Sequence, residues 1–234
     1  MDKIAVYCAS RNYYKHLLPA VMSLTTNSSV DIVYLLIEDN VFPYALPSNV
    51  KTINMKRQTY FSCTGPNYNS KWTYFSLLRV ALPLIFYMHD KILYLDVDTI
   101  VNDNIDAIWD IDLGDNYFAA VKEIHKSTDK YKYFNAGVML MNLKALRDSG
   151  IASMMINVLN VRKFDFCDQD CLNLFCEGKI LEIPSCYNVN PYTEATKDKK
   201  IIHFAGDKNW ENKDVYKYYM EHYSWNSFKY IVKL

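Results

Sequence analysis

Residues 91–99 read Lys-Ile-Leu-Tyr-Leu-Asp-Val-Asp-Thr, an apolar run that ends in two aspartates separated by one residue. The run is typical of a buried strand, which carries no carboxylate within itself. Side chains of an extended segment alternate between two faces, so Asp96 and Asp98 are expected to point the same way. In open α/β sheets, ligands bind beyond the carboxyl ends of the strands. The pair can therefore hold a hard divalent cation, and through it a diphosphate. The alternative is that Asp96 caps the following turn and Asp98 is solvated.

Strand and helix signals alternate on both sides of this segment. Apolar, β-branched runs predict strands at 3–9, 31–37, 50–53, 91–95, 117–121, 136–141, 180–183 and 201–204. Helical spacing predicts helices at 14–26, 72–84, 143–148, 151–161, 168–177 and 214–222, and residues 54–70 are expected to form a loop. This alternation indicates an α/β fold with a mostly parallel central sheet. No linker, charge block or repeat interrupts it, so residues 1–234 are expected to form one domain, with 213–234 as a helical, aromatic C-terminal tail.

The composition excludes several classes of protein. The 26 basic and 26 acidic residues cancel, whereas a dedicated nucleic-acid binder would show a basic excess. The longest apolar run, residues 80–88, is far shorter than the roughly 20 residues of a membrane span. The first expected strand follows Met1 almost directly and leaves no room for a signal peptide, so a cytoplasmic, reducing location is expected.

Three of the six cysteines, Cys167, Cys171 and Cys176, lie close together in the sequence. Such a cluster could bind zinc, but the chain contains no C-x-x-C pair. The pattern therefore favours small buried hydrophobic residues over a zinc site.

A second polar segment follows the expected strand at 201–204. His203 comes directly after two isoleucines, and a neutral imidazole at a strand end can be a third metal ligand. Gly206 permits close approach of the backbone, and Lys208 offers a positive charge for a phosphate. The alternative is a structural histidine whose hydrogen bonds are satisfied within the core.

Two further segments carry polar or small residues where a ligand could bind. Asp168-Gln169-Asp170 stands at the head of an expected helix, where capping alone would explain the acidic residues. The glutamine between them is an amide that can donate and accept at once. In Phe134-Asn135-Ala136-Gly137, small side chains let backbone amides approach a ligand.

Other nucleotide and hydrolase motifs are absent. The chain has no G-x-x-x-x-G-K-[ST], G-x-G-x-x-G or G-x-S-x-G sequence. Phosphatases of the haloacid-dehalogenase type also carry a D-x-D after a strand, but theirs lies on an early strand and has Thr or Val two residues beyond the second Asp. Here the pair lies at 96–98 and Ile100 occupies that position, which disfavours a phosphatase.

Taken together, these segments resemble glycosyltransferase family 8, the group that contains glycogenin and the bacterial lipooligosaccharide galactosyltransferases. The resemblance covers residues 3–210 and rests on five collinear segments: Ala9-Ser10-Arg11-Asn12-Tyr13, Arg79-Val80-Ala81-Leu82-Pro83 with Leu95-Asp96-Val97-Asp98-Thr99, Phe134-Asn135-Ala136-Gly137-Val138, Asp168-Gln169-Asp170, and His203-Phe204-Ala205-Gly206 with Lys208. It implies a nucleotide-diphosphosugar-binding, GT-A-like fold. It also implies retaining transfer of glucose or galactose from a UDP-sugar, with Mn²⁺ (or Mg²⁺) as the metal.

The resemblance also implies roles for individual residues. The implied metal ligands are Asp96, Asp98 and His203. The remaining donor-site residues form three groups: Ala9, Ser10, Asn12 and Tyr13 around the nucleotide, with Tyr13 stacked on uracil; Arg79, Asn135, Ala136, Gly137, Asp168 and Gln169 around the sugar; and Gly206 and Lys208 at the diphosphate. Val97, between the two aspartates, would also belong to the donor-binding site. The catalytic residues would be Gln169 and Asp168. Gln169 could be a weak nucleophile or could assist front-face departure, which we favour because an amide is a poor nucleophile. Asp168 would stabilise the cation-like sugar.

Two departures from the family pattern concern the nucleotide. Many members have Asp where Ser10 stands, and many have one more residue between the histidine and the lysine, followed by Pro-Trp rather than Asn209-Trp210.

Two rival functions are a catalytically inactive nucleotide-sugar-binding protein and a metal-dependent nucleotidyltransferase. The latter would normally show a glycine-rich loop after the first strand, and residues 8–13 contain no glycine. The acceptor could be a glycan, a lipid-linked glycan or a protein.

The C-terminal tail carries many aromatic residues together with Lys217, Lys229 and Lys233. Such a tail could make a peripheral membrane contact and bring the enzyme to a lipid-linked acceptor. The alternative, which we favour, is that aromatic residues such as Tyr216 and Tyr219 pack a closing helix onto the sheet.

Overall fold

The structure is a computed structural model that describes residues 2–70, 72–207 and 209–221. Its centre is a seven-stranded sheet with the strand order β3-β2-β1-β4-β7-β6-β8. The strands are β1 (Ile4–Cys8), β2 (Ile32–Ile37), β3 (Val50–Asn54), β4 (Lys91–Leu95), β6 (Phe118–Ala120), β7 (Val138–Asn142) and β8 (Ile180–Glu182). All neighbouring pairs are parallel except those that β7 makes with β4 and β6. The mostly parallel sheet expected from the sequence is confirmed.

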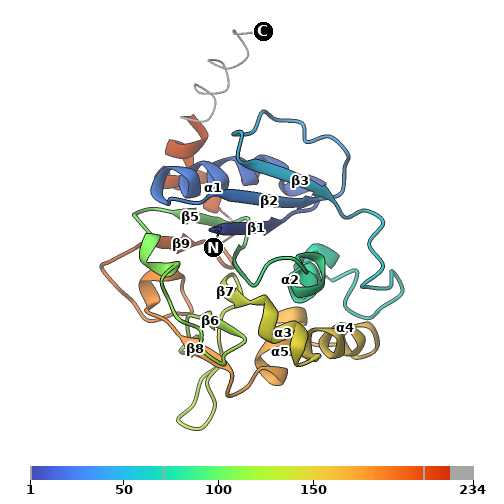
Figure 1. Ribbon diagram of the computed structural model, residues 1–234. Coiled ribbons are helices and arrows are strands. Elements are labelled where there is room, and N and C mark those ends of the chain that lie inside the picture. The colour runs from blue at the N-terminus through green and yellow to red at the C-terminus, as the bar shows by residue number, and fades with distance from the viewer. Residues whose placement is uncertain (1, 71, 208, 222–234) are drawn as a thin grey trace.

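Helices cover one face of this sheet, and helix α1 with adjoining loops covers the other (Figure 1). The first face packs against α2 (Thr73–Ile85), α3 (Leu143–Asp148), α4 (Ile151–Val161) and α5 (Cys167–Phe175), and the second against α1 (Tyr14–Asn27). Strand residues alternate between these layers, so Val6 joins the first core and Tyr7 the second. Because both faces of the inner strands are buried, β1 and β2 are apolar throughout their length, whereas the edge strand β3 exposes Lys51 and Thr52.

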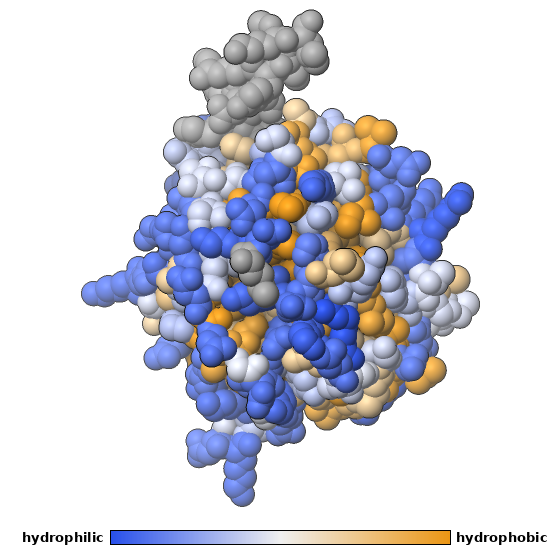
Figure 2. Space-filling model, in the orientation of Figure 1, coloured by the Kyte–Doolittle hydropathy of each residue, from blue (hydrophilic) through white to orange (hydrophobic). Residues whose placement is uncertain are grey.

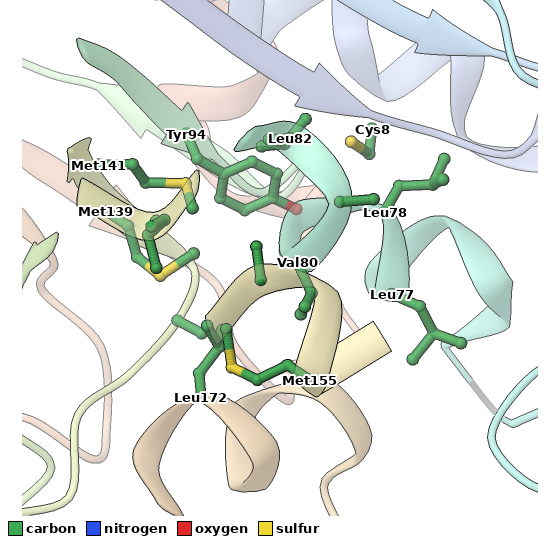
Figure 3. Close-up of a cluster of buried hydrophobic side chains, with 14 of the residues drawn as sticks. Cys8, Leu77, Leu78, Val80, Leu82, Tyr94, Met139, Met141, Met155 and Leu172 are labelled. Atoms are coloured by element: carbon green, nitrogen blue, oxygen red, sulfur yellow. The ribbon is translucent and has the colours of Figure 1, made fainter. Parts of the chain in front are cut away.

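Figure 3 shows the core between the sheet and α2. Tyr94 of β4 and Met139 and Met141 of β7 lie on the sheet side, and Leu78 and Leu82 of α2 face them. This packing fixes the end of β4, where the aspartate pair begins, relative to α2.

A second, two-stranded sheet joins segments that are far apart in the sequence. In it, β5 (Thr99–Val101) pairs antiparallel with β9 (Ile201–His203), and Thr99 stands opposite His203. The sequence predicted the strand at 201–204 but not β5. The pairing brings His203 beside the aspartates that precede β5.

Aromatic residues near the C-terminus cover this second sheet. Phe204, Trp210, Tyr216 and Tyr219 form one buried cluster with Ile100 of β5, and residues 214–221 are helical. The Tyr216 hydroxyl lies 2.9 Å from Nδ1 of His16, and the Tyr219 hydroxyl accepts a 2.7 Å hydrogen bond from Asn27. The expectation that this helix packs onto the molecule is confirmed as far as residue 221. Residues 222–234 lie outside the described part of the chain.

The surface seen in Figure 2 is mostly hydrophilic, with hydrophobic residues in patches between hydrophilic ones. None of the helices in the described ranges is long and apolar enough to cross a membrane.

The cysteine cluster is internal: Cys167, Cys171 and Cys176 are all buried, and the Cys171 thiol lies 3.9 Å from the carbonyl oxygen of Met155. These three cysteines are therefore core residues.

Candidate active site

Asp96 and Asp98 come together with His203 just beyond β4. One ligand atom from each of the three side chains lies within 4.8 Å of the other two. His203 Nε2 is 3.3 Å from an oxygen of Asp98 and 3.8 Å from an oxygen of Asp96. The expected convergence of the three residues is confirmed.

The aspartates do not converge in the way that strand alternation suggested. β4 ends at Leu95, and residues 96–98 form a turn rather than an extended segment. The Thr99 amide and hydroxyl both donate to the Asp96 carbonyl oxygen, at 3.2 and 2.7 Å. The turn, not a strand face, therefore directs both carboxylates toward His203.

His203 is buried, and a hydrogen bond fixes its ring. Its Nδ1 atom lies 2.9 Å from Oδ1 of the buried Asn188, which leaves Nε2 facing the two carboxylates. The neighbouring residue Val189 accepts a 2.9 Å hydrogen bond from the His203 amide, so the Asn188 segment runs beside β9. A partner of this kind on the second ring nitrogen is the usual arrangement around a metal-binding histidine.

The electrostatics of the three side chains favour a bound positive charge. Burial disfavours the imidazolium, but Asp98 and Asp96 outweigh it, and the pKa of His203 lies above its ordinary value. Burial likewise disfavours the Asp98 carboxylate, but the adjacent His203 outweighs it and lowers the pKa of Asp98. Two carboxylate oxygens and one imidazole nitrogen form a donor set suited to a divalent cation such as Mn²⁺ or Mg²⁺. The residues present therefore fit the metal that the resemblance implies.

Gly137 leaves room for this group of side chains. A Cβ atom at this position would stand 2.2 Å from Cε1 of His203 and 2.9 Å from a carboxylate oxygen of Asp96. The Gly137 carbonyl oxygen also accepts a 2.8 Å hydrogen bond from the Asp96 amide. Glycine is needed here because the backbone passes directly against the candidate metal ligands.

Arg79 of α2 links the metal group to α5. Its guanidinium lies 2.9 Å from Asp96 and 2.8 Å from Asp168, and it donates to the Ala136 carbonyl oxygen at 2.7 Å. Asp168 is only 4% exposed; burial raises its pKa to about 6, and Arg79 opposes that rise. The Tyr94 hydroxyl donates to Asp96 at 2.6 Å. The Asp168 carboxylate is thus directed at Arg79.

Gln169 lies in the first turn of α5, as the sequence predicted. Its Oε1 accepts a 2.9 Å hydrogen bond from the Ala136 amide, and its Nε2 donates to Glu123 at 3.2 Å and to the Tyr133 hydroxyl at 3.3 Å. Sequence reasoning missed Glu123, Tyr133 and Asn188. They lie in loops without periodic patterning, so no local signal marks them.

The expected nucleotide-binding residues follow β1, which lies beside β4 in the sheet. Parallel neighbours end at one edge, so this segment and the aspartate pair share it. Ala9 is buried, whereas Tyr13 is 41% exposed and available for stacking. Ser10 and Asn12 lie in or next to the short helix Arg11–Tyr13, whose Arg11 pairs with Asp39.

The remaining expected residues lie in the turn after β4 and beyond β9. Val97 is half-buried against the core on the α1 side of the sheet. Gly206 has a φ of +75°, which favours glycine, and a Cβ there would stand 2.8 Å from the Tyr192 hydroxyl. Lys208 lies outside the described residues.

Comparison with known proteins agrees with this geometry. The sequence profile of Glycosyl transferase family 8 matches residues 4–214. General stress protein A of Bacillus subtilis is 24% identical over 95% of this chain and 94% of its own length. Lipopolysaccharide 1,2-glucosyltransferase of Escherichia coli K12 is 28% identical over 64% of this chain and 53% of its own length.

Solved structures show the same fold at lower sequence identity. The galactosyltransferase LgtC, solved in complex with donor and acceptor sugar analogues, superposes with a TM-score of 0.71 at 22% identity, covering 97% of this chain and 95% of LgtC. The glycosyltransferase GlyE of Streptococcus pneumoniae gives a TM-score of 0.69 at 20% identity, covering 100% of this chain and 64% of GlyE. The fold is the GT-A fold of these enzymes. With a family profile that spans nearly the whole of its length, the chain belongs to glycosyltransferase family 8.

Proposed function

We propose that this chain is a retaining hexosyltransferase that uses a UDP-sugar, with Mn²⁺ (or Mg²⁺) held by Asp96, Asp98 and His203. The observation that carries the proposal is the convergence of these three side chains within 4.8 Å at the edge of the sheet where α/β proteins bind ligands. Family membership supports glycosyl transfer, and the donor set supports a metal-bound diphosphate.

The chain's own residues would bind the donor along this edge. When bound, the divalent cation would offset the negative charge that develops on the departing UDP. Tyr13 would stack on uracil, and Ala9, Ser10, Asn12 and Val97 would line the nucleotide pocket. Gly206 and Lys208 would contact the diphosphate and so help to stabilise the negative charge of the leaving group.

The sugar would lie between α5 and the segment that precedes β7. Here Arg79, Asn135, Ala136 and Gly137 would contact the hexose, together with Asp168 and Gln169. An amide is a poor nucleophile, and the Gln169 oxygen already accepts a hydrogen bond from the Ala136 amide. We therefore assign Gln169 to assisting front-face departure, in which the new bond forms on the face from which UDP leaves. The negative charge of Asp168 would stabilise the cation-like sugar.

The donor sugar is glucose or galactose, and the acceptor is a glycan, a lipid-linked glycan or a protein. A glucosyltransferase acting on lipopolysaccharide stands among the relatives and a galactosyltransferase among the structural neighbours, which supports both donors equally. A bacterial-type glycan acceptor is consistent with those relatives.

Measuring which product leaves the donor separates this proposal from its two rivals. The full chain is incubated with UDP-glucose or UDP-galactose, with and without Mn²⁺ and with and without added pyrophosphate, and UDP and UTP are both quantified. A hexosyltransferase releases UDP by slow hydrolysis in Mn²⁺ even without an acceptor. A nucleotidyltransferase instead transfers the uridylyl group to the added pyrophosphate, which releases UTP and a hexose 1-phosphate. An inactive binding protein retains Mn²⁺-dependent UDP binding but forms neither UDP nor UTP.

A further inference from the structure

Glu123, in the loop after β6, is a buried carboxylate with no part in the proposed reaction. It is 4% exposed, and within the described residues no basic side chain forms an ion pair with it. One of its oxygens, Oε1, accepts hydrogen bonds from Asn135 Nδ2 at 2.7 Å and from Gln169 Nε2 at 3.2 Å. Burial of a charged group costs free energy unless its hydrogen bonds compensate, so the position of this carboxylate requires an explanation.

The explanation begins with the direction of these hydrogen bonds. An ionised carboxylate only accepts, whereas an amide side chain can present either its oxygen or its nitrogen. Glu123 therefore forces Asn135 to present Nδ2 to it and to turn Oδ1 the other way. The backbone amide of Gly137, which can only donate, lies 3.0 Å from that oxygen and requires the same orientation.

The first branch of the network leads from Asn135 to the candidate metal ligand. Asn135 Oδ1 accepts a 2.9 Å hydrogen bond from Nδ2 of the fully buried Asn188, so the Asn188 oxygen faces His203. Asn190 Nδ2 donates to the same Asn188 oxygen at 3.0 Å. The His203 Nδ1 atom, 2.9 Å from this oxygen, must then carry the hydrogen. In the neutral ring, which is the form that binds a metal, Nε2 then presents its lone pair to the space shared with Asp96 and Asp98.

The second branch leads directly to Gln169. Because Glu123 accepts from Nε2, the Gln169 oxygen is turned toward the Ala136 amide, 2.9 Å away. The Ala136 backbone amide, which only donates, and the Glu123 carboxylate, which only accepts, require the same orientation of the Gln169 side chain. The face of Gln169 that would meet the sugar is thereby fixed.

We propose that Glu123 is a positioning residue that fixes both ends of the site: the tautomer of His203, through Asn135 and Asn188, and the amide orientation of Gln169. The role of Gln169 in this inference rests on the proposed function, because it assumes that Gln169 contacts the donor sugar. The role of His203 concerns metal binding alone. One acceptor-only group thus accepts from the two amide side chains, Asn135 and Gln169, with which the branches begin.

The first test measures Mn²⁺ affinity on the full chain without any donor sugar, by electron paramagnetic resonance titration. Glu123→Met keeps the length of the side chain but removes the acceptor, and should weaken Mn²⁺ binding about 10- to 100-fold, as loss of an outer-shell partner does. Glu123→Gln keeps an oxygen acceptor and should stay close to the wild type. The matched control is Glu182→Met, at a partly exposed glutamate that pairs with Lys132 on the surface.

The two branches are then separated by variants that interrupt only one of them. Asn188→Leu should weaken Mn²⁺ binding, and Gln169→Met should lower the rate of UDP release while leaving Mn²⁺ affinity unchanged; Glu123→Met should do both. Nitrogen-15 NMR of histidine-labelled protein in Mg²⁺ should show the Nδ1–H tautomer of His203 in the wild type and a mixture in Asn188→Leu. Should Glu123→Met fail to fold, Asn188→Leu still tests the His203 branch.

Two results would overturn the inference: wild-type Mn²⁺ affinity in Glu123→Met or Asn188→Leu, or a Glu123→Gln variant as impaired as Glu123→Met. The first would show that the network does not position the ligand, and the second that the charge of Glu123, not its acceptor direction, matters. A wild-type protein that binds Mn²⁺ but releases no UDP would contradict the proposed function, while the affinity series would still decide the role of Glu123.

Discussion

A single methyl group at Gly137 would collide with the candidate metal ligands, because the added Cβ would stand 2.2 Å from the His203 ring. We expect Gly137→Ala to displace that ring and to weaken Mn²⁺ binding by at least the roughly tenfold that a misplaced ligand costs. Gly114→Ala is the control: its Cβ meets no atom within 4 Å, but its φ of +49° disfavours alanine. The control should lose thermal stability and keep its Mn²⁺ affinity. Unchanged Mn²⁺ affinity in Gly137→Ala would contradict the site geometry.

Substitution of His203 tests whether this buried histidine is a metal ligand or a structural residue. His203→Ala should lose Mn²⁺-dependent UDP binding by calorimetry more than it loses melting temperature, because the ring contributes one of the three donors that the described part of the chain brings together. His16→Ala is a matched control, since His16 is also buried and contacts Tyr216 but lies outside the metal group. The control should lower the melting temperature and leave the metal titration unchanged. The same pattern in His203→Ala would mean that His203 is structural.

At the scale of single residues, the sequence predicted the candidate metal ligands but not the residues whose hydrogen bonds position the site. Asp96, Asp98 and His203 each follow an apolar run, and that local contrast marks them. Asn188 and Glu123 act through hydrogen bonds to residues distant in the chain, at separations of 15 and 46 positions. Polar residues in loops are common, so no pattern in the sequence distinguishes these two from solvated ones.

At the scale of elements, every strand and helix predicted within the described residues is present, with its bounds within two residues. Local apolar periodicity determines these elements, which is why the sequence reveals them. The pairing of β5 with β9 was not predicted, because β5 is short and its partner lies about a hundred residues further along the chain. The site depends on that long-range pairing, since it brings His203 to the aspartates.

Arg79 connects α2 with the end of β4 and with α5, and its loss should weaken the contacts between these three elements. Arg79→Gln leaves the Asp168 carboxylate buried without its charged partner, which typically costs about 3–5 kcal/mol in the free energy of unfolding. Arg11→Gln is the control, because the pair of Arg11 with Asp39 lies at the surface, where solvent screens it, and should contribute much less to the free energy of unfolding. Urea denaturation of both variants measures the difference. Equal losses would show that the Arg79 pairs do not stabilise the contact between these elements.

At the scale of the whole molecule, alternating strands and helices predicted the layered α/β fold, because both faces of the sheet must be covered by helices. The reversed direction of β7 was not foreseen: strand direction depends on how the chain returns through residues 121–137, which carry no regular periodicity. Organisation of residues 1–234 as one domain with a C-terminal tail stays a prediction, since the tail extends beyond the described residues.

The C-terminal tail bears on whether the whole molecule binds to membranes. Tyr216 and Tyr219 are buried against the second sheet, and their hydroxyl groups are hydrogen-bonded to His16 and Asn27 of α1, which favours packing over membrane contact. We therefore expect the full chain and a chain that ends at Ser224 to sediment equally with anionic liposomes. Greater sedimentation of the full chain would instead assign membrane binding to residues 225–234, including Lys229 and Lys233.

The most direct test of the central claim is the rate of UDP release in the wild type and in Asp98→Asn. Asp98 supplies one of the three donors, and the substitution removes its charge without changing its shape. We predict that wild-type protein releases UDP from UDP-glucose or UDP-galactose in Mn²⁺, that EDTA abolishes the release and Mn²⁺ restores it. Asp98→Asn should remain folded and lose more than the roughly 10- to 100-fold that an outer-shell change costs. Near-wild-type release by Asp98→Asn in Mn²⁺ would contradict the assignment of this site.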